Sequence, residues 1–190
     1  MAHTIRISLL AAGLALALPL GAQQYEPTIV GVTGRLSQPE GDLKDATGGF
    51  GKPGFGFGVF MEEDFLDGYR GRLGLGTDMW FKGDWVGKPG VRGGVTSATF
   101  YAEAMKMLRP DADPPLLGPY VLAGVGLTAW SLTTEAAGVT TTSRATHVTG
   151  TFGFGWRFAE KFDVEIKILY GKVNTDFTAG ALMAGVNYRF

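Results

Sequence analysis

The sequence predicts an all-β fold, namely an eight-stranded antiparallel up-and-down transmembrane β-barrel that follows a cleavable signal peptide. Apolar and aromatic residues alternate with small or polar ones along most of the chain, which indicates strands with one apolar face. The 190 residues include 30 glycines, 13 phenylalanines, 6 tyrosines and 4 tryptophans. Glycine spread among alternating aromatics is typical of curved, closed sheets, because it relieves crowding on the inner face.

Residues 1–22 have the pattern of a secretory signal peptide. Arg6 supplies a positive charge, residues 7–18 form an apolar run, and Pro19 and Gly21 end that run before Ala22. The run is too short to cross a bilayer as a helix, which needs about 20 residues. We therefore expect cleavage near residue 22 and a single exported domain over residues 23–190.

The first four predicted strands cover residues 27–37, 49–61, 68–82 and 94–107. In the first, Val30 and Val32 share one face and Arg35 lies on the other. The second contains G-F-G-F-G-V-F, which sets aromatics against glycines. The third alternates leucines with arginines and glycines, and the fourth places Phe100 opposite Glu103. Each strand is therefore expected to have one apolar face and one small or polar face.

The last four predicted strands cover residues 119–132, 146–158, 162–172 and 178–190. Three of them alternate clearly, but the fifth is ambiguous. Its Tyr120 and Trp130 share one face, and Val121, Val125 and Leu127 share the other. Ten residues tilted by about 40° span roughly 25 Å, the height of an apolar membrane band. Because Tyr120 and Trp130 are ten residues apart, we assign both to an outward aromatic belt.

The alternation divides the strands into two sets of side chains. The expected lipid-facing aromatic belt comprises Tyr69, Phe81, Tyr120, Trp130, Phe154, Trp156, Phe158, Phe162, Tyr170 and Tyr188. The expected inward charges are Arg35, Arg70, Arg72, Asp78, Glu103, Arg157, Glu165, Lys167 and Arg189. An eight-stranded barrel is just wide enough for side chains to fill. Charges inside it must be paired, which predicts a charge-plugged lumen or, as the alternative, a gate whose pairs rearrange.

The connections between the predicted strands differ in length. Residues 38–48, 82–93 and 132–145 are long and polar, and we expect them to be external loops that are open to surface partners. Residues 62–67 and 159–161 are short, as periplasmic turns are. Residues 109–119 depart from this asymmetry, because the segment should be periplasmic yet is long and rich in proline.

The signal, the eight amphipathic strands, the G-D-L-K-D segment at 41–45 and the Tyr188-Arg189-Phe190 end resemble the small outer-membrane β-barrel family. OmpA-type barrel domains and OmpX are members of that family. The resemblance implies the outer membrane of a Gram-negative-type bacterium and contact with outer-membrane lipid and lipopolysaccharide. It also implies that the barrel-assembly machinery recognises the C-terminal strand, with Phe190 as the insertion signal.

Three functional classes stay open from the sequence. The first is a non-enzymatic structural or surface-interaction barrel, and the second is a narrow OmpW-like transporter for small or apolar solutes. The third is a lipid A-modifying enzyme, because outer-membrane lipid A deacylases carry a His-x-Ser pair and this chain has His147 and Thr149 at that spacing. Thr149 replaces the serine, so we expect no enzyme and no catalytic residue.

Composition excludes several partners and cofactors. The chain has no cysteine and two histidines, one of them within residues 1–22, so thiolate and multi-histidine metal sites are excluded. Its formal net charge of −1 argues against a nucleic-acid partner. We expect no cofactor.

Overall fold

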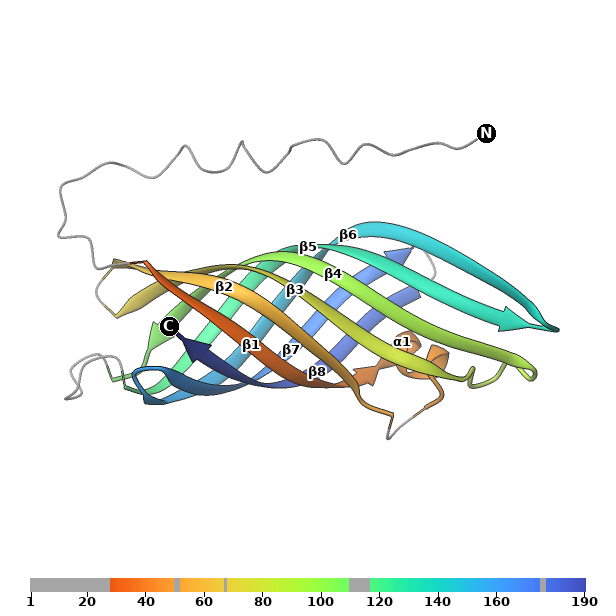
Figure 1. The fold of residues 1–190 in the computed structure, drawn as a ribbon, viewed down its shortest axis with the longest axis horizontal. Helices are drawn as coiled ribbons and strands as arrows, with labels where there is room; N and C mark the ends of the chain where they lie inside the picture. The colour runs from red at the N-terminus through yellow and green to blue at the C-terminus, as the bar shows by residue number, and fades with distance from the viewer. Residues whose placement is uncertain (1–27, 50–51, 67, 110–116, 175–176) are drawn as a thin grey trace.

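Eight antiparallel strands close into one barrel, as the sequence predicts. The computed structural model describes residues 28–49, 52–66, 68–109, 117–174 and 177–190. The strands follow one another around the barrel in sequence order, and β8 pairs with β1 to close it (Figure 1). The predicted signal peptide and most of the 109–119 connection lie outside the described residues.

The elements follow one another with few interruptions. They are β1 (Ile29–Glu40), α1 (Gly41–Ala46), β2 (Gly54–Leu66), β3 (Tyr69–Asp84), β4 (Val91–Met107), β5 (Gly118–Ala136), β6 (Val139–Ala159), β7 (Phe162–Asn174) and β8 (Phe177–Arg189). One end of the barrel holds the C-terminus and the last residues of β2, β4 and β6, and we call it the turn end (Figure 1). At the other end, the protruding end, β3 to β6 extend beyond the remaining strands. No helix in the described ranges is long and apolar enough to span a membrane.

The barrel is apolar outside. Large apolar side chains on every strand are exposed, among them Leu36, Phe57, Leu75, Phe100, Leu127, Phe152, Ile166 and Leu182. A water-soluble monomer rarely exposes an apolar surface of this extent, whereas a lipid-facing wall requires one. The exterior is therefore suited to hydrocarbon.

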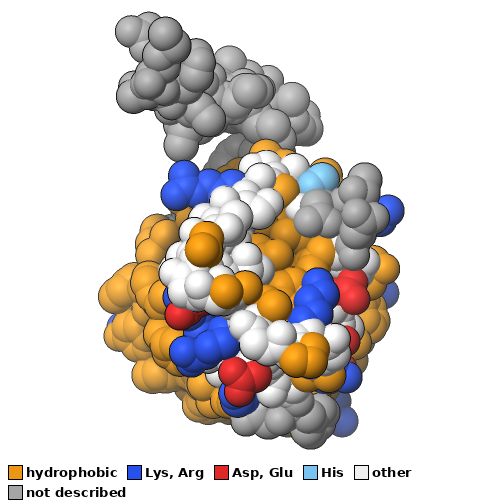
Figure 2. Space-filling model, turned by 90° about the vertical axis from the view of Figure 1, so that its right-hand side faces the viewer, with side chains coloured by type: hydrophobic (Ala, Val, Ile, Leu, Met, Phe, Trp, Pro, Cys, Tyr) orange, Lys and Arg blue, Asp and Glu red, His pale blue; other side chains and the backbone are white. Residues whose placement is uncertain are grey.

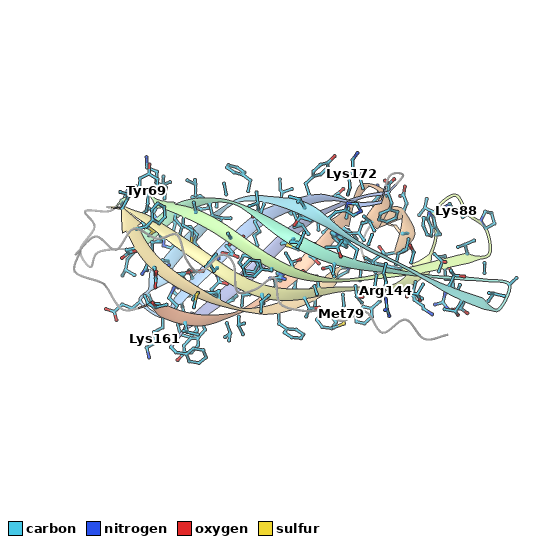
Figure 3. All side chains as sticks on the ribbon, turned by 90° about the horizontal axis from the view of Figure 1, so that it is seen from above. Tyr69, Met79, Lys88, Arg144, Lys161 and Lys172 are labelled. Atoms are coloured by element: carbon cyan, nitrogen blue, oxygen red, sulfur yellow. The ribbon has the colours of Figure 1, made fainter. Side chains whose placement is uncertain are left out.

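Aromatic rings gather on the outer wall at the turn end. Phe158 stacks on Phe162 with centroids 6.2 Å apart, and Phe162 lies 4.9 Å from Tyr188, which contacts Phe190 at 5.3 Å. Figure 3 places Tyr69 and Lys161 at this same end, opposite Lys88. Rings at the edge of an apolar band form the girdle that is typical of the membrane interface.

Two residues of the predicted aromatic belt point the other way. Tyr120 and Trp130 are buried in the barrel interior, with 0% and 1% exposure, and Val125 and Leu127 face outward instead. The outward assignment of Tyr120 and Trp130 is therefore wrong. Glycine on the neighbouring strand explains the burial of Tyr120: a Cβ on Gly155, its register partner, would lie 2.1 Å from the Tyr120 ring. The missing side chain makes room for an inward ring.

The predicted loop at 132–145 is a β-hairpin. β5 and β6 pair without a break up to Ala136 and Val139, and Ala137 and Gly138 form a two-residue turn with φ of 50° and 78°. Positive φ at both turn residues matches the twist of a hairpin. The segment is rich in threonine, which is polar like a loop residue but β-branched and favourable in strands.

The other two predicted loops are also more ordered than expected. Residues 38–40 belong to β1, and the segment that follows forms α1, which inserts Leu43 and Ala46 into the mouth of the barrel. Both side chains join an apolar cluster that contains Trp80, Trp130 and other buried residues. In the 82–93 segment, β3 runs to Asp84 and β4 starts at Val91. Helix α1 therefore covers the interior at the protruding end (Figure 1).

The apolar exterior makes a prediction about mutations on β6. Phe154 is 45% exposed on the outer wall, and Phe154→Arg should destabilise the protein in lipid vesicles by about 2–4 kcal/mol if it lies near the bilayer midplane. Thr142→Arg, on the protruding part of the same strand, should cost far less. Urea unfolding in vesicles measures both variants. Equal stability of Phe154→Arg and wild type would contradict the face assignment of β6.

Candidate functional site

The interior of the barrel is crowded with charged side chains. The charge network, as we call it, comprises the buried residues Arg35, Glu62, Arg70, Arg72, Asp78, Glu103, Arg157, Asp163, Glu165, Lys167 and Arg189. All nine charges that alternation assigns inward are in this set. With Asp64, which contacts Arg70 near the turn end, the six cations meet six carboxylates. Within the described residues, the interior is therefore electrically balanced.

Glu62 is the centre of the network near the turn end. It is fully buried and accepts hydrogen bonds from Arg72 at 2.9 Å and from Arg157 and Arg189 at 3.0 Å each. Asp163 adds a second carboxylate, which is paired with Arg189 and lies 3.7 Å from Arg157. These groups come from β2, β3, β6, β7 and β8, so the ion pairs cross the barrel from wall to wall.

A second group of charges lies next to the first and is joined to it by Arg72. The Arg72 guanidinium contacts Glu165 at 2.8 Å and Glu103 at 3.3 Å. Lys167 bridges the same two carboxylates and lies 2.9 Å from Glu103 and 3.2 Å from Glu165. The Tyr120 hydroxyl donates to Glu165 at 3.4 Å. The inward ring of Tyr120 therefore helps to satisfy the charges that it packs against.

A third pair lies nearer the protruding end. Arg35 on β1 donates two hydrogen bonds to Asp78 on β3, at 2.6 Å and 2.8 Å. Gly56 on the intervening strand leaves the space for this pair, because a Cβ there would lie 2.1 Å from Asp78 Oδ1. A bidentate pair fixes the distance between β1 and β3, and any side chain at position 56 would push it apart.

Hydroxyls and apolar rings fill the rest of the interior. Thr128 shares hydrogen bonds with Thr99 at 3.0 Å and with Thr149 at 2.8 Å. Towards the protruding end, Trp80 and Trp130 stack with centroids 6.2 Å apart beneath α1. Charged, hydroxylated and apolar side chains thus fill the lumen in succession along the barrel axis.

Glu62 and Asp163 were not among the predicted inward charges. We expected residues 62–67 to be a turn, and we took Phe162 as the start of the seventh strand without assigning a role to Asp163. The alternation did contain the signal. Glu62 continues the inward series of Gly54, Gly56, Gly58 and Phe60, and Asp163 precedes Glu165 and Lys167 at the same parity.

The His147 and Thr149 pair lacks the arrangement of a catalytic dyad. Thr149 is buried, and its hydroxyl is engaged by Thr128 and donates to the Gly126 carbonyl at 3.4 Å. Among the residues that the structure describes, no carboxylate forms a hydrogen bond with His147, and no cluster of three acidic or histidine side chains could hold a metal. Thr149 therefore belongs to the set of interior threonines, with Thr99 and Thr128, whose hydroxyls bond to one another.

The protruding sheet has one free edge. β6 pairs with β5 from Val139 onward, but its pairing with β7 begins only at Thr149, opposite Gly171. Residues 139–148 thus have no strand partner on their second edge among the described residues. Nothing in the β5–β6 register indicates a bulge that would disrupt this edge.

The opposite edge of the same sheet is covered. β3 has a register shift between Trp80 and Gly83, and the backbone of Thr47 lies against Gly83, where a Cβ would be 2.0 Å from the Thr47 carbonyl oxygen. The Val86 N–H also donates to the Asp45 carbonyl at 2.9 Å. Bulges and covering segments are the usual protection of an edge strand. Only the β6 edge lacks such protection in the part of this sheet that the structure describes.

Comparisons with solved structures find the same fold. The chain is similar to Ail, the attachment invasion locus protein of Yersinia pestis, with 13% identity and a TM-score of 0.60 over 86% of this chain and 97% of that one. Neisserial surface protein A gives 13% identity and 0.54, over 88% and 100%. The N-terminal β-barrel domain of Pseudomonas aeruginosa OprF gives 15% and 0.55, over 88% and 100%. At these identities the likeness shows the fold alone.

A comparison with curated protein sequences finds no match. The family model for the outer membrane protein beta-barrel domain, however, matches residues 8–190, which is nearly the whole chain. The closed eight-stranded sheet and its apolar exterior agree with that match. The protein belongs to the outer-membrane β-barrel family and is located in the outer membrane of a Gram-negative-type bacterium.

Proposed function

We propose that the protein is a non-conducting, non-enzymatic barrel whose sealed lumen anchors a protruding β-sheet that binds partners at the cell surface. The filled interior is the observation that supports the seal. Opposite walls are joined by Arg72 and Glu165, from β3 and β7, at 2.8 Å. Glu62 and Arg157, from β2 and β6, join them likewise at 3.0 Å. An ion would have to separate such pairs to pass, and an unpaired buried charge is costly.

The second part of the proposal rests on the free edge of β6. An exposed edge strand presents unpaired N–H and C=O groups, which an extended peptide can pair with by adding a strand. Residues 139–148 read V-T-T-T-S-R-A-T-H-V and contain no proline and no acidic residue. Such a strand would bind mainly through its backbone, because most of its side chains are small and uncharged.

The transporter remains the second candidate, and one observation favours it. From Thr149 and Gly171 towards the protruding end, β6 and β7 are not paired. The apolar cluster that contains Leu132 and Val173 lies next to this opening. Figure 2 shows hydrophobic side chains in the middle of this end, between polar ones. An apolar solute could leave sideways there, but α1 and the charge network block the barrel axis.

Planar-bilayer recording separates the two candidates. The sealed barrel should show no steady single-channel conductance, because paired charges fill the lumen. A variant in which residues 41–46 are replaced by a Gly-Ser segment should also stay closed, since the charge network lies below α1. A large, steady conductance of the wild-type protein would refute the seal and favour the transporter.

Peptide binding tests the β6 edge. Uncharged decapeptides rich in threonine and valine should bind the barrel in vesicles, as measured by fluorescence anisotropy. Two N-methylated peptides are compared, one methylated at its odd-numbered residues and one at its even-numbered residues. One of them should not bind and the other should bind like the unmethylated peptide, because an added strand turns only alternate N–H groups toward β6. A variant that lacks residues 133–136 and 139–142 places Leu132 and Ser143 beside the two-residue turn. Four residues are removed from each strand, so the pair that flanks the turn keeps its hydrogen-bonding type, and the variant should bind more weakly. Equal binding of both N-methylated forms would contradict strand addition.

A further inference from the structure

The outer wall has a shallow apolar depression of about 450 Å³ that spans β2 to β6. Its floor consists of Thr77, Ala98, Ala129 and Thr146. These four residues are register neighbours on successive strands, so they form one row across the wall. We call the depression the wall groove.

The groove exists because a row of small residues lies beside a row of large ones. On the side towards the turn end, the next row contains Leu75, Phe100 and Leu127, which are 46–57% exposed. The Thr77 hydroxyl donates to the Ser97 carbonyl at 2.8 Å, and this bond satisfies it within the wall. The floor therefore offers apolar surface, which hydrocarbon covers well.

On β4, β5 and β6, the wall becomes more polar on the side of this groove towards the protruding end. The next row towards the protruding end contains Met79, Thr96, Ser131 and Arg144, which are also register neighbours. Figure 3 labels Met79 and Arg144, the two ends of that row. Arg144 is exposed, and no carboxylate pairs with it among the described residues. A free guanidinium thus lies directly above an apolar groove, at the edge of the apolar band.

We propose that the wall groove and Arg144 bind one outer-leaflet glycolipid of the lipid A type, with an acyl chain in the groove and a phosphate on Arg144. A guanidinium recognises phosphate through paired, charge-assisted hydrogen bonds. The protruding end faces outward if the turn end is periplasmic, as in this class of barrel. The groove therefore lies at the level where the phosphates of the outer leaflet meet its acyl chains.

A second copy of the chain fits this surface less well. A stable protein interface buries about 800 Å² per partner and depletes charge from its centre. The surface area of the groove is far smaller than that. Its rim carries Arg144, which pairs with no carboxylate in the part of the chain that the structure describes. The site shares Arg144 and Thr146 with the proposed β6 edge. It uses their outward side chains, whereas strand addition uses the backbone of residues 139–148, so Arg144→Gln leaves the groups that would pair with an added strand intact.

Native mass spectrometry of the purified full chain in detergent tests the site, with diphosphorylated lipid A as the probe. Wild type should retain one lipid A. Arg144→Gln should weaken retention about tenfold, because a charged hydrogen bond is lost, and Ala98→Trp should weaken it by filling the groove. Arg92→Gln, a control on the same sheet whose partner is Asp84, should bind like wild type.

Two further measurements check the folding of each variant and the role of the lipid phosphate. Heat-modifiable gel migration establishes that each variant is folded before its lipid is counted. Dephosphorylated lipid A should bind wild type about as weakly as the phosphorylated form binds Arg144→Gln. Unchanged retention in folded Arg144→Gln would overturn the proposal, and so would equal displacement of lipid A by phosphatidylglycerol, which would assign the phosphate to a phospholipid.

Discussion

The pairing of charge inside the barrel is the constraint on which the rest of the structure depends. Glu62 lies on β2, and its partners Arg72, Arg157 and Arg189 come from β3, β6 and β8, with sequence separations of up to 127 residues. A buried ion pair adds little net stability, but a buried charge without its partner is expensive. The cations and carboxylates can all be paired only when the barrel is closed in this register. If one strand slipped by one residue, the inward charges of that strand would move into the lipid.

Glycine and aromatic residues let the barrel hold this network. Gly56 leaves room for the Arg35–Asp78 pair, and Gly155 leaves room for the ring of Tyr120. A small barrel has little free volume, so each bulky inward side chain needs a vacancy on the neighbouring strand. The abundance of glycine in the composition is thus explained by close contacts in the lumen as well as by curvature of the sheet.

Alternation predicted the fold class and the nine inward charges because period two is a local property of a strand. It failed where the pattern allowed two readings. Tyr120 and Trp130 are apolar enough for the belt, and only the glycine opposite Tyr120, which depends on register, would have placed that ring inside. Glu62 was not predicted as an inward charge because the second strand was predicted to end at residue 61, whereas β2 extends to Leu66. The hairpin at 132–145 was taken for a loop because threonine is polar. The pairing of the charges depends on contacts between distant strands, which local alternation does not encode.

The molecule has two structurally different parts, a barrel whose interior is filled with side chains and a protruding sheet with one unpaired edge. The part in the membrane has an apolar outer wall that faces lipid and paired charges in its interior. In the protruding part of β3 to β6, backbone groups of β6 are unpaired among the described residues. Rigid anchoring of the sheet by the barrel would hold that edge in an extended shape before any partner arrives. Less conformational entropy is then lost on binding.

The Arg35–Asp78 pair tests most directly whether mutual compensation of charge holds the lumen together, because Arg35 has no second carboxylate among its described ion pairs. Urea unfolding in lipid vesicles would compare Arg35→Met, Asp78→Leu and the double variant. Each single change should cost about 3–5 kcal/mol, less where water reaches the lumen, because one buried charge loses its partner. The double variant should recover much of that loss, since no orphan charge remains. Losses that simply add in the double variant would contradict the account.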